Sequence, residues 1–215
     1  MKHVAPLHAA EEAPMKAPTR RALAKQQTRA KVLAAARRLF SEAGYEGATI
    51  RDIAAAAGMS TGAVFANFAD KSDLFREIML TDMAALGDAM SSAAARGADV
   101  EDALLKLFIA GYSFYRSQLP LARAAFSVGW SPEDGPALRS SPAAQALNDL
   151  VAAILKEGVK KGEIADADLD VRARMLFETY LSNYPQAIFE AWTLEALEAR
   201  SRDQIRILLA GARRA

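Results

Sequence analysis

The sequence contains no cysteine, and its two histidines, His3 and His8, lie among its first eight residues. The absence of cysteine excludes disulfides, thiol catalysis and thiolate metal sites, and it is compatible with a reducing compartment. Because no histidine lies in the part expected to fold, a histidine-based catalytic triad is excluded and a transition-metal site is not expected. The chain also lacks a glycine-rich phosphate loop and paired carboxylates in an apolar context. We therefore expect no enzyme activity and no cofactor; an enzyme that relies on carboxylates, lysine or tyrosine is the less favoured alternative.

Long apolar runs are missing as well. No stretch approaches the roughly 20 apolar residues that a membrane-spanning helix needs, and residues 1–14 lack the apolar core of a signal peptide. We therefore expect a cytoplasmic protein that makes no membrane contact. Hydrophobic residues make up 52% of the 215 residues and charged residues 25%, which is ordinary for a globular protein. Alanine is abundant and β-branched runs are scarce, which favours an all-α fold.

The most informative segment is TIRDIAAAAGMSTGAVFANF, residues 49–68. Its periodicity predicts two short helices joined by a tight turn. Thr49 and Ser60 each precede one of these helices, where a hydroxyl can accept a bond from an unpaired backbone N–H.

Three residues in this segment have the spacing of a helix-turn-helix. Ala54 is a small residue where the helices cross, Gly58 suits a left-handed turn, and Val64 fills the angle between the helices. Such a unit usually places its second helix in the major groove of DNA.

The charge is small overall but unevenly distributed. Nine Lys and Arg residues, against only Glu42 and Glu46, lie between Lys16 and Arg51. This segment has a net charge of +7, so the remainder of the chain has −6 for a total of +1. A basic segment beside an acidic body is typical of a phosphate-binding module attached to a regulatory domain. The alternative is a solvated basic helix face.

Two longer segments extend this pattern: VLAAARRLFSEAGYEGATI at residues 32–50 and FANFADKSDLF at residues 65–75. With them, residues 28–80 resemble the DNA-binding region of the tetracycline-repressor (TetR) family of bacterial regulators. The family usually has tyrosine where Phe65 stands and often histidine where Asn67 stands. A hydroxyl that reaches phosphate and a positive charge are therefore absent at these two positions.

The resemblance implies an all-α fold of about nine helices, in which a three-helix DNA-binding domain precedes a helical-bundle regulatory domain. We expect a flexible basic-ended tail over residues 1–20, a DNA-binding domain over 21–70, and a ligand-binding and dimerisation domain over 71–215. Arg20 and Arg21 are either disordered or form an arm for a neighbouring minor groove. Besides the helix-turn-helix, periodicity predicts helices over residues 23–43, 71–95, 100–117, 120–128, 143–161, 169–192 and 194–213, with a loop over 129–142.

Most contacts to duplex DNA go to phosphates, and base contacts come from the exposed start of the recognition helix. The phosphate candidates are Lys71, where the family carries its phosphate-contacting lysine, and Thr49 and Arg51 at the start of the second helix. Thr49 can instead serve only as a cap, and Phe65 either packs or contacts the DNA backbone. The candidates for base contacts are Ser60, Thr61, Gly62, Ala63 and Asn67, the last of which can pair with adenine or a phosphate.

The resemblance also implies a homodimer formed through the last two helices, on a palindromic double-stranded DNA operator. The last helix has a suitable apolar stripe, although this stripe can alternatively pack only within the monomer. Its members are Leu194, Leu197, Ile205, Leu208 and Leu209.

The regulatory part is rich in aromatic residues, which commonly line pockets for small apolar ligands. Packing of these residues as plain core is the alternative at each position. Pro185 inside a helical pattern and a loop around Trp130 favour a pocket. We expect a small apolar effector, aromatic or acyl-type, at Phe108, Tyr112, Tyr115, Phe126, Trp130, Phe177, Tyr180 and Tyr184.

These features predict a one-component DNA-binding transcriptional regulator, specifically a repressor that its effector releases from DNA. The alternative is a helical interaction or sensor module with a vestigial DNA-binding unit. An acidic cluster at Glu163, Asp166, Asp168 and Asp170 can bind a divalent cation, but a solvated turn with a helix cap is the favoured interpretation.

Overall fold

The computed structural model describes residues 19–116, 119–129, 135–190 and 192–210. Within these residues all regular structure is helical, which confirms the all-α prediction. In chain order the helices are α1 (Arg20–Gly47), α2 (Ile50–Ala56), α3 (Thr61–Phe65), α4 (Lys71–Ala94), α5 (Val100–Arg116), α6 (Leu119–Gly129), α7 (Gly135–Arg139), α8 (Pro142–Lys160), α9 (Leu169–Ser182), α10 (Tyr184–Ile188) and α11 (Leu194–Ala210).

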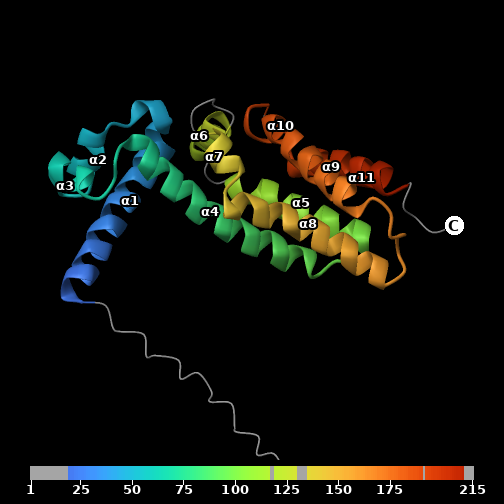
Figure 1. The fold of residues 1–215 in the computed structure, drawn as a ribbon. Helices are drawn as coiled ribbons and strands as arrows, with labels where there is room; N and C mark the ends of the chain where they lie inside the picture. The colour runs from blue at the N-terminus through green and yellow to red at the C-terminus, as the bar shows by residue number, and fades with distance from the viewer. Residues whose placement is uncertain (1–18, 117–118, 130–134, 191, 211–215) are drawn as a thin grey trace, which may run out of the picture.

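Helices α1 to α3 form a small unit at one end of an elongated molecule (Figure 1). Phe40 of α1, Ile53 of α2 and Val64 of α3 are fully buried in its core, together with Leu74 of α4. Burying each such side chain stabilises the unit by about 1.5–3 kcal/mol. Leu121 of α6 is also fully buried in this core, so the unit packs directly against the body.

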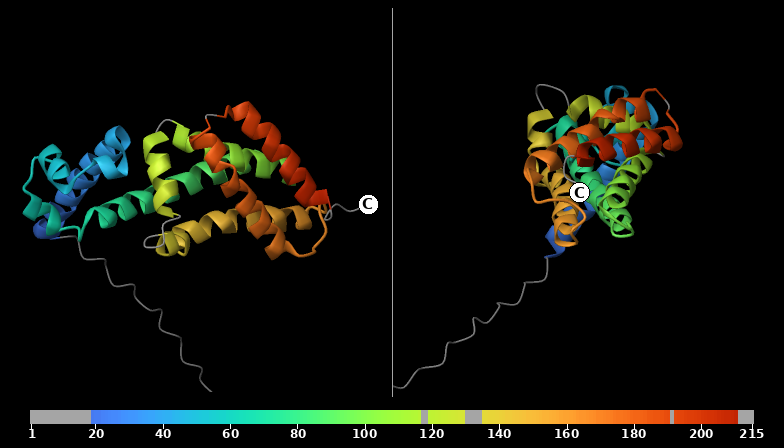
Figure 2. Two further views of the ribbon diagram at one scale, coloured as in Figure 1. Left: turned by 90° about the horizontal axis from the view of Figure 1, so that it is seen from above. Right: turned by 90° about the vertical axis from the view of Figure 1, so that its right-hand side faces the viewer.

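Helix α4 leaves the small unit and runs the length of the body, where it lies along α5 and α8 (Figures 1 and 2). Helix α5 is apolar on most sides and lies in the middle, in contact with α4, α8 and α11. The core of the body is one continuous cluster from these helices and α9, and its fully buried members include Met90, Leu104, Leu107, Phe108, Val151, Leu155, Leu176 and Ile205.

The start of α4 is fixed by two carboxylates that bond to backbone N–H groups. The Asp73 N–H donates to Asp70 Oδ1 at 2.7 Å, and the Ala69 N–H donates to Asp73 Oδ2 at 3.1 Å. The bond from Ala69, with help from the nearby Arg76, lowers the pKa of Asp73 below its ordinary value. These bonds satisfy groups that a helix start leaves unpaired, and so they set the angle between α3 and α4.

Three helix boundaries differ from the predictions. Helix α1 begins at Arg20, because the Ala22 N–H donates to Thr19 Oγ1 at 3.2 Å, so Arg20 and Arg21 are helical residues. The expected loop over 129–142 contains the short helix α7. The expected helix over 169–192 is divided at Asn183 into α9 and α10, since Pro185 cannot donate to the ladder of α9.

Across the described ranges, no helix combines the length and apolarity that a membrane crossing requires. The same residues contain no cluster of acidic or histidine side chains arranged for a metal ion. In the acidic turn, the Glu163 carboxylate instead accepts a bond from the Val100 N–H at 2.7 Å, which joins the turn to the start of α5.

Candidate functional site

The turn between α2 and α3 has the geometry that its sequence predicts. Thr49 Oγ1 accepts from the Asp52 N–H and Ser60 Oγ accepts from the Ala63 N–H, both at 3.2 Å, so each helix is capped. Gly58 has a φ of +70°, which only glycine adopts without strain. Val64 is fully buried in the angle between the two helices. The helix-turn-helix is therefore formed by its two helix caps, the glycine in its turn and the buried Val64 together.

The start of helix α3 has an exposed face made of small residues. Thr61 and Gly62 are exposed and Ala63 is half-buried, so the helix backbone can approach a surface closely. Phe65 is 55% exposed, unusually high for a phenylalanine, and so it does not serve as core. A flat apolar ring beside small polar residues suits contact with sugar edges and thymine methyl groups in a DNA groove.

Asn67, the predicted adenine-pairing residue, is turned toward its own helix. Its side-chain amide donates to the Ala63 carbonyl at 2.9 Å, and its side-chain oxygen is buried without a partner among the described residues. A direct base contact by Asn67 therefore requires a different side-chain rotamer.

Lys71 also lies closer to the protein than its predicted role suggests. Its ammonium donates to the Tyr45 carbonyl at 2.9 Å, lies 4.3 Å from the centre of the Tyr45 ring, and is 3.8 Å from the Glu46 carboxylate. A lysine has three N–H donors, so two remain for a phosphate. Lys71 thus holds the last turn of α1 at the edge of the candidate DNA surface.

Thr49 and Arg51, the remaining phosphate candidates, differ in availability. The Thr49 hydroxyl donates to the Asp52 carboxylate at 2.6 Å while it caps α2, so its bonding capacity is largely used. Arg51 is exposed, and no ion pair involves it within the described ranges.

Two arginines of the basic segment bind other groups of the protein, a role that the sequence did not predict. Arg29 bonds to the Asn67 carbonyl and the Glu77 carboxylate, and its guanidinium stacks 4.3 Å from the centre of the Phe68 ring. Arg37 donates two hydrogen bonds to the carboxylate of Asp82, which is only 6% exposed. Their carboxylate partners, Glu77 and Asp82, lie in α4, 48 and 45 residues farther along the chain, so no local pattern reveals them.

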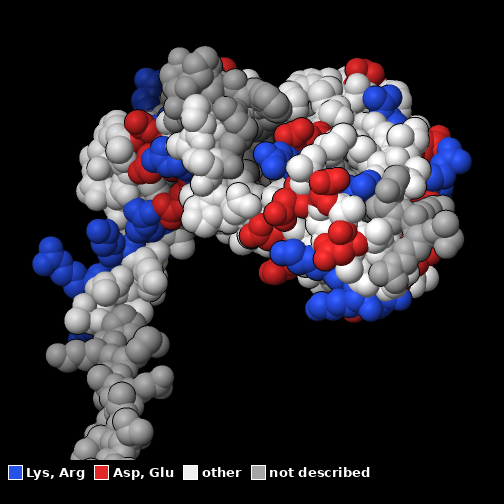
Figure 3. Space-filling view, turned by 45° about the vertical axis from the view of Figure 1, so that its right-hand side comes forward, with Lys and Arg blue, Asp and Glu red and all other residues white. Residues whose placement is uncertain are grey.

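The unpaired positive charge on the surface of the α1–α3 unit is consequently smaller than its composition suggests. The Lys and Arg side chains that remain visible lie mainly along the exposed start of α1, whereas acidic and basic groups alternate over the body (Figure 3). Lys and Arg side chains also gather at the lower edge of the body in this view (Figure 3).

A cavity of about 820 Å³ lies in the body between α4, α5, α6, α8 and α9. Five of the predicted ligand-binding residues line it, namely Tyr115, Phe126, Phe177, Tyr180 and Tyr184. Phe108 and Tyr112 do not line it; they lie in the core of the body, where their rings pack against Tyr180. Trp130 lies outside the described residues.

The tyrosines behind and along this cavity share a network of hydrogen bonds. The hydroxyls of Tyr180 and Tyr184 are 2.5 Å apart, and the Tyr112 hydroxyl donates to the Tyr180 carbonyl at 3.2 Å. A Cβ atom at Gly111 would lie 2.1 Å from the Tyr180 hydroxyl, so only glycine permits α5 and α9 to approach here. Burial raises the pKa of Tyr112 to about 12, which keeps this hydroxyl protonated.

The mouth of the cavity is charged, which the aromatic pattern alone does not predict. Five exposed charged residues of α8 and α9 border it, namely Asp149, Lys156, Asp170, Arg174 and Glu178. Polar residues at helical spacing on a solvent-facing surface carry no signal that distinguishes a pocket rim from ordinary surface.

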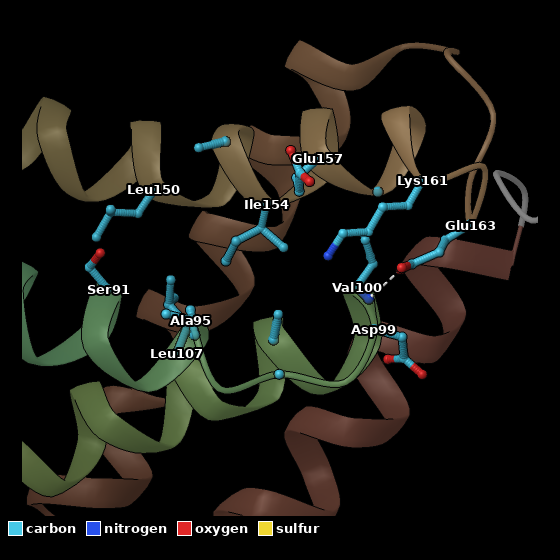
Figure 4. A pocket seen from close by; sticks show the side chains of 15 residues that line it. Ser91, Ala95, Asp99, Val100, Leu107, Leu150, Ile154, Glu157, Lys161 and Glu163 are labelled. Carbon is cyan, nitrogen blue, oxygen red and sulfur yellow. Dashed lines mark hydrogen bonds between the residues drawn. The ribbon is translucent and has the colours of Figure 1, made fainter.

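A second, smaller cavity of about 290 Å³ lies at the far end of the body, between the end of α4, the start of α5 and the end of α8. Its lining is partly apolar, with Leu150 and Ile154 of α8 on the side opposite Leu107 of α5 (Figure 4). Glu157 and Lys161 stand at its edge (Figure 4). The bond between Val100 and Glu163 closes one side of it.

The apolar stripe predicted for the dimer interface packs inside the monomer. Leu197, Ile205 and Leu209 are at most 1% exposed and belong to the core of the body, and Leu194 and Leu208 pack against it. The prediction that this stripe meets a partner is therefore wrong for Leu197, Ile205 and Leu209, because a helix at the surface of a bundle uses its apolar face for its own core, whereas Leu194 and Leu208 are half-buried.

The last long helices nevertheless expose other apolar side chains. Val171 and Met175 of α9 are 52% and 47% exposed, and Ile207 of α11 is 68% exposed. Helices α9 and α11 lie side by side at the outer surface of the body (Figure 2). Val171 and Met175 are four residues apart, so they share one face of α9.

Part of the sequence is similar to known bacterial regulatory proteins. Residues 32–78 match the family described as "Bacterial regulatory proteins, tetR family". The HTH-type transcriptional repressor AcnR of Corynebacterium glutamicum is 44% identical over 64 residues, which are 30% of this chain and 34% of AcnR. The match thus spans about a third of that relative's length.

Solved structures extend the likeness to the whole fold. A protein described as a tetR-family transcriptional regulator from Mesorhizobium loti superimposes with a TM-score of 0.71 at 20% identity, over 92% of this chain and 100% of that one. The regulator FadR of Bacillus subtilis, in complex with stearoyl-CoA, has a TM-score of 0.69 at 20% identity, over 85% of this chain and 98% of FadR. At this level of identity the likeness establishes the fold alone.

Proposed function

We propose that this chain, a member of the tetR family of bacterial regulatory proteins, is a transcriptional repressor that binds operator DNA as a homodimer and is released by a small effector. The observation that carries the proposal is the exposed start of α3, with its small residues and a 55% exposed Phe65, on a capped helix-turn-helix. Several matched relatives are transcriptional repressors, so the alternative of a vestigial DNA-binding unit is not favoured.

The proposed DNA contacts fall into two groups. Thr61, Gly62 and Ala63 approach base edges in the major groove, and Phe65 meets the adjacent backbone. Arg51 and Lys71 bind the phosphates on either side, since both lie at helix starts beside α3. Ser60 and Thr49 act mainly as caps that aim free N–H groups at phosphates.

The proposed dimer forms through α9 and α11. Val171, Met175 and Ile207 supply its apolar contacts, because these large side chains are otherwise exposed to water. Two copies joined at this surface would hold their two α3 helices at a fixed distance, which a palindromic operator must match.

The proposed effector occupies the cavity of about 820 Å³. FadR, which shares the fold, binds stearoyl-CoA, and an apolar effector of aromatic or acyl type fits the aromatic lining here. A ligand that favours one spacing of the α3 helices changes operator affinity through a reciprocal coupling of about 1–3 kcal/mol.

Selection of bound duplexes from a random pool tests this function. The expected product is an inverted repeat whose half-site centres lie one or more helical turns apart. A pool that shows no enrichment, with purified dimer at low salt, rejects the repressor assignment. Enrichment of a single half-site without symmetry rejects the dimeric mode while it keeps DNA binding.

A further inference from the structure

Three cations in the first turns of α1 have no partner among the described residues. Arg20, Arg21 and Lys25 are all exposed, and none of them forms an ion pair or a side-chain hydrogen bond within the described ranges. Farther along the same helix, Arg29 and Arg37 both bind carboxylates of α4. The first three residues, which form the α1 patch, therefore carry positive charge that the described part of the chain does not neutralise.

The α1 patch lies where a helix disfavours cations. The free N–H groups at a helix start give this end a partial positive charge, so acidic side chains stabilise it and basic ones destabilise it. The first turn of α1 contains no acidic residue, and the first acidic residue of the helix is Glu42. Helix stability does not explain the three cations, so the α1 patch favours an anionic partner outside the monomer.

The contacts of Arg29 show which way this end of α1 faces. Its guanidinium bonds to the carbonyl of Asn67, just after α3, and stacks on the Phe68 ring. Lys25 and Arg21 precede Arg29 by four and eight residues, so they share its face of the helix. At about 1.5 Å per residue, they lie about 6 and 12 Å beyond Arg29 along the helix axis. The first turns of α1 extend past α3, clear of the other helices (Figure 1).

Duplex DNA fits both the charge and the spacing of this surface. A helix that occupies the major groove, which is about 12 Å wide, has a phosphate backbone on either side of it. When α3 lies in the groove, a basic face that begins beside its end and continues for about 12 Å meets the backbone of the flanking base pairs. Contacts of Lys and Arg with phosphates are the contacts that position a protein on DNA without reading its sequence.

We propose that the α1 patch binds the sugar–phosphate backbone outside the half-site that α3 reads. This inference rests on the proposed role of α3 in DNA binding. Arg20 lies nine residues before Arg29, or about 13 Å, so the patch extends the footprint by about four base pairs at about 3.4 Å each. Because Arg20 and Arg21 are helical, the contact is part of a rigid element and needs no folding on binding.

Fluorescence anisotropy with three duplexes tests the proposal. The first is the selected inverted repeat, cut at the outer edges of its half-sites, and the second has about six further base pairs on each side, slightly more than the estimated reach of the patch. The third is a shuffled duplex of the longer length. We expect the flanks to tighten binding of the full chain by roughly tenfold at low salt, because they supply phosphates for several cations.

The triple variant Arg20→Ala/Arg21→Ala/Lys25→Ala should lose the effect of the flanks. For the flanked repeat, its slope of log affinity against log salt should be smaller by about two or more. Its affinity for the short repeat should stay close to that of the unmodified chain. Alanine favours helix and removes charge that opposes the helix dipole, so the variant should unfold no earlier, which circular dichroism checks.

The matched control is Arg96→Ala/Lys160→Ala/Lys161→Ala, which removes three exposed cations from the far end of the body. Both triple variants change the net charge equally, so any general attraction between protein and DNA weakens equally in the two. The control should keep the effect of the flanks. Sedimentation velocity of both variants detects the other use of the patch, a contact with a second copy of the chain.

Equal affinity of the unmodified chain for the short and the flanked repeat, a flank effect that survives in the α1 variant, or an equal loss in the control would each overturn the proposal. A change of oligomeric state without a change in DNA affinity would also overturn it, because the patch would then be an interface between copies.

The shuffled duplex separates this proposal from the repressor assignment. Selective binding of the repeat without any flank effect rejects the patch and keeps the repressor assignment. If no repeat is selected, weaker binding of the shuffled duplex by the α1 variant, but not by the control, keeps the patch as a DNA contact and rejects the repressor assignment. Unchanged binding of the shuffled duplex in that case rejects both.

Discussion

The guanidinium of Arg37 lies 2.5 Å from the carboxylate of Asp82, and this pair joins α1 of the DNA-binding unit to α4 of the body. Asp82 is almost completely buried, whereas Arg37 is 33% exposed. A carboxylate left alone in such a place loses both its counter-charge and two hydrogen bonds. The pair is therefore a structural connection between the unit that contacts DNA and the helix that lines the cavity.

Replacement of Arg37 by alanine should lower the free energy of unfolding by about 2 kcal/mol, less than for a fully buried pair because water reaches the arginine. Arg38→Ala is the neighbouring control. Its partner Glu42 is 3.8 Å away and both side chains are 58% exposed, so its loss should cost under about 0.5 kcal/mol. Urea unfolding of both variants measures the difference, and equal costs would contradict the structural role of Arg37.

Two glycines of the helix-turn-helix should respond in opposite ways to a methyl group. Gly58→Ala forces alanine to a φ of +70° although no atom lies within 4 Å of its Cβ, and the backbone strain alone should cost about 1–2 kcal/mol. Gly62→Ala, in the first turn of α3, should raise stability by up to about 1 kcal/mol. Its Cβ meets only Ser60 Oγ, at 3.8 Å.

The same Gly62→Ala variant should nevertheless bind DNA more weakly, because its added methyl group projects from the exposed start of α3. Thermal unfolding and fluorescence anisotropy on one preparation give both values. A stabilised variant with unchanged DNA affinity would mean that Gly62 does not face the groove.

Lys71→Ala should weaken binding to selected and unrelated duplexes alike and reduce the slope of log affinity against log salt by about one. The ammonium keeps two donors for phosphate beyond its bond to the Tyr45 carbonyl. Lys160→Ala, on α8 far from α3, should leave the slope unchanged. If affinity falls in Lys71→Ala while the slope is constant, Lys71 only positions the last turn of α1.

Ile207→Glu should convert the proposed dimer to monomers at micromolar concentration, because it places a charge among the apolar side chains of α9 and α11. Ile207 is 68% exposed, so the monomer fold should be unaffected. Ala146→Glu, at an exposed position of α8, is the control and should remain dimeric. Sedimentation velocity measures both, and a dimeric Ile207→Glu protein would place the interface elsewhere.

Stability should fall as the pH rises above about 10. The pKa of Tyr112 rises from 10.0 to about 12 on folding, chiefly through burial. Above pH 10 the unfolded chain releases a proton that the folded chain retains, so the stabilisation is complete below the unfolded pKa and is lost as the pH passes the folded one. Urea midpoints between pH 8 and 12 should fall less steeply in Tyr112→Phe than in the unmodified chain.

Local features of the structure were accessible from the sequence. The caps at Thr49 and Ser60, the left-handed turn at Gly58 and the buried Val64 follow from residue chemistry at fixed spacing. The same holds for the aromatic lining of the cavity, where helical periodicity brought Tyr180 and Tyr184 to one face.

Contacts between residues far apart in the sequence could not be predicted. Nothing in the sequence near Arg29 or Arg37 distinguishes an internal strut from a phosphate-binding arginine, because the deciding carboxylates lie in α4. The stripe on α11 has the same periodicity whether it meets a partner or its own core. Only the packing shows that Leu197 and Ile205 are covered and that Ile207 is not.

The central claim is that α3 recognises a DNA sequence, and the most direct test is the affinity ratio between a selected duplex and a shuffled duplex of equal length and composition. Fluorescence anisotropy across a salt series gives this ratio. The account predicts a ratio of at least about 10³, typical of specific DNA-binding proteins, with both affinities falling as salt rises. A ratio near one, or no binding of either duplex in dilute buffer, would contradict it.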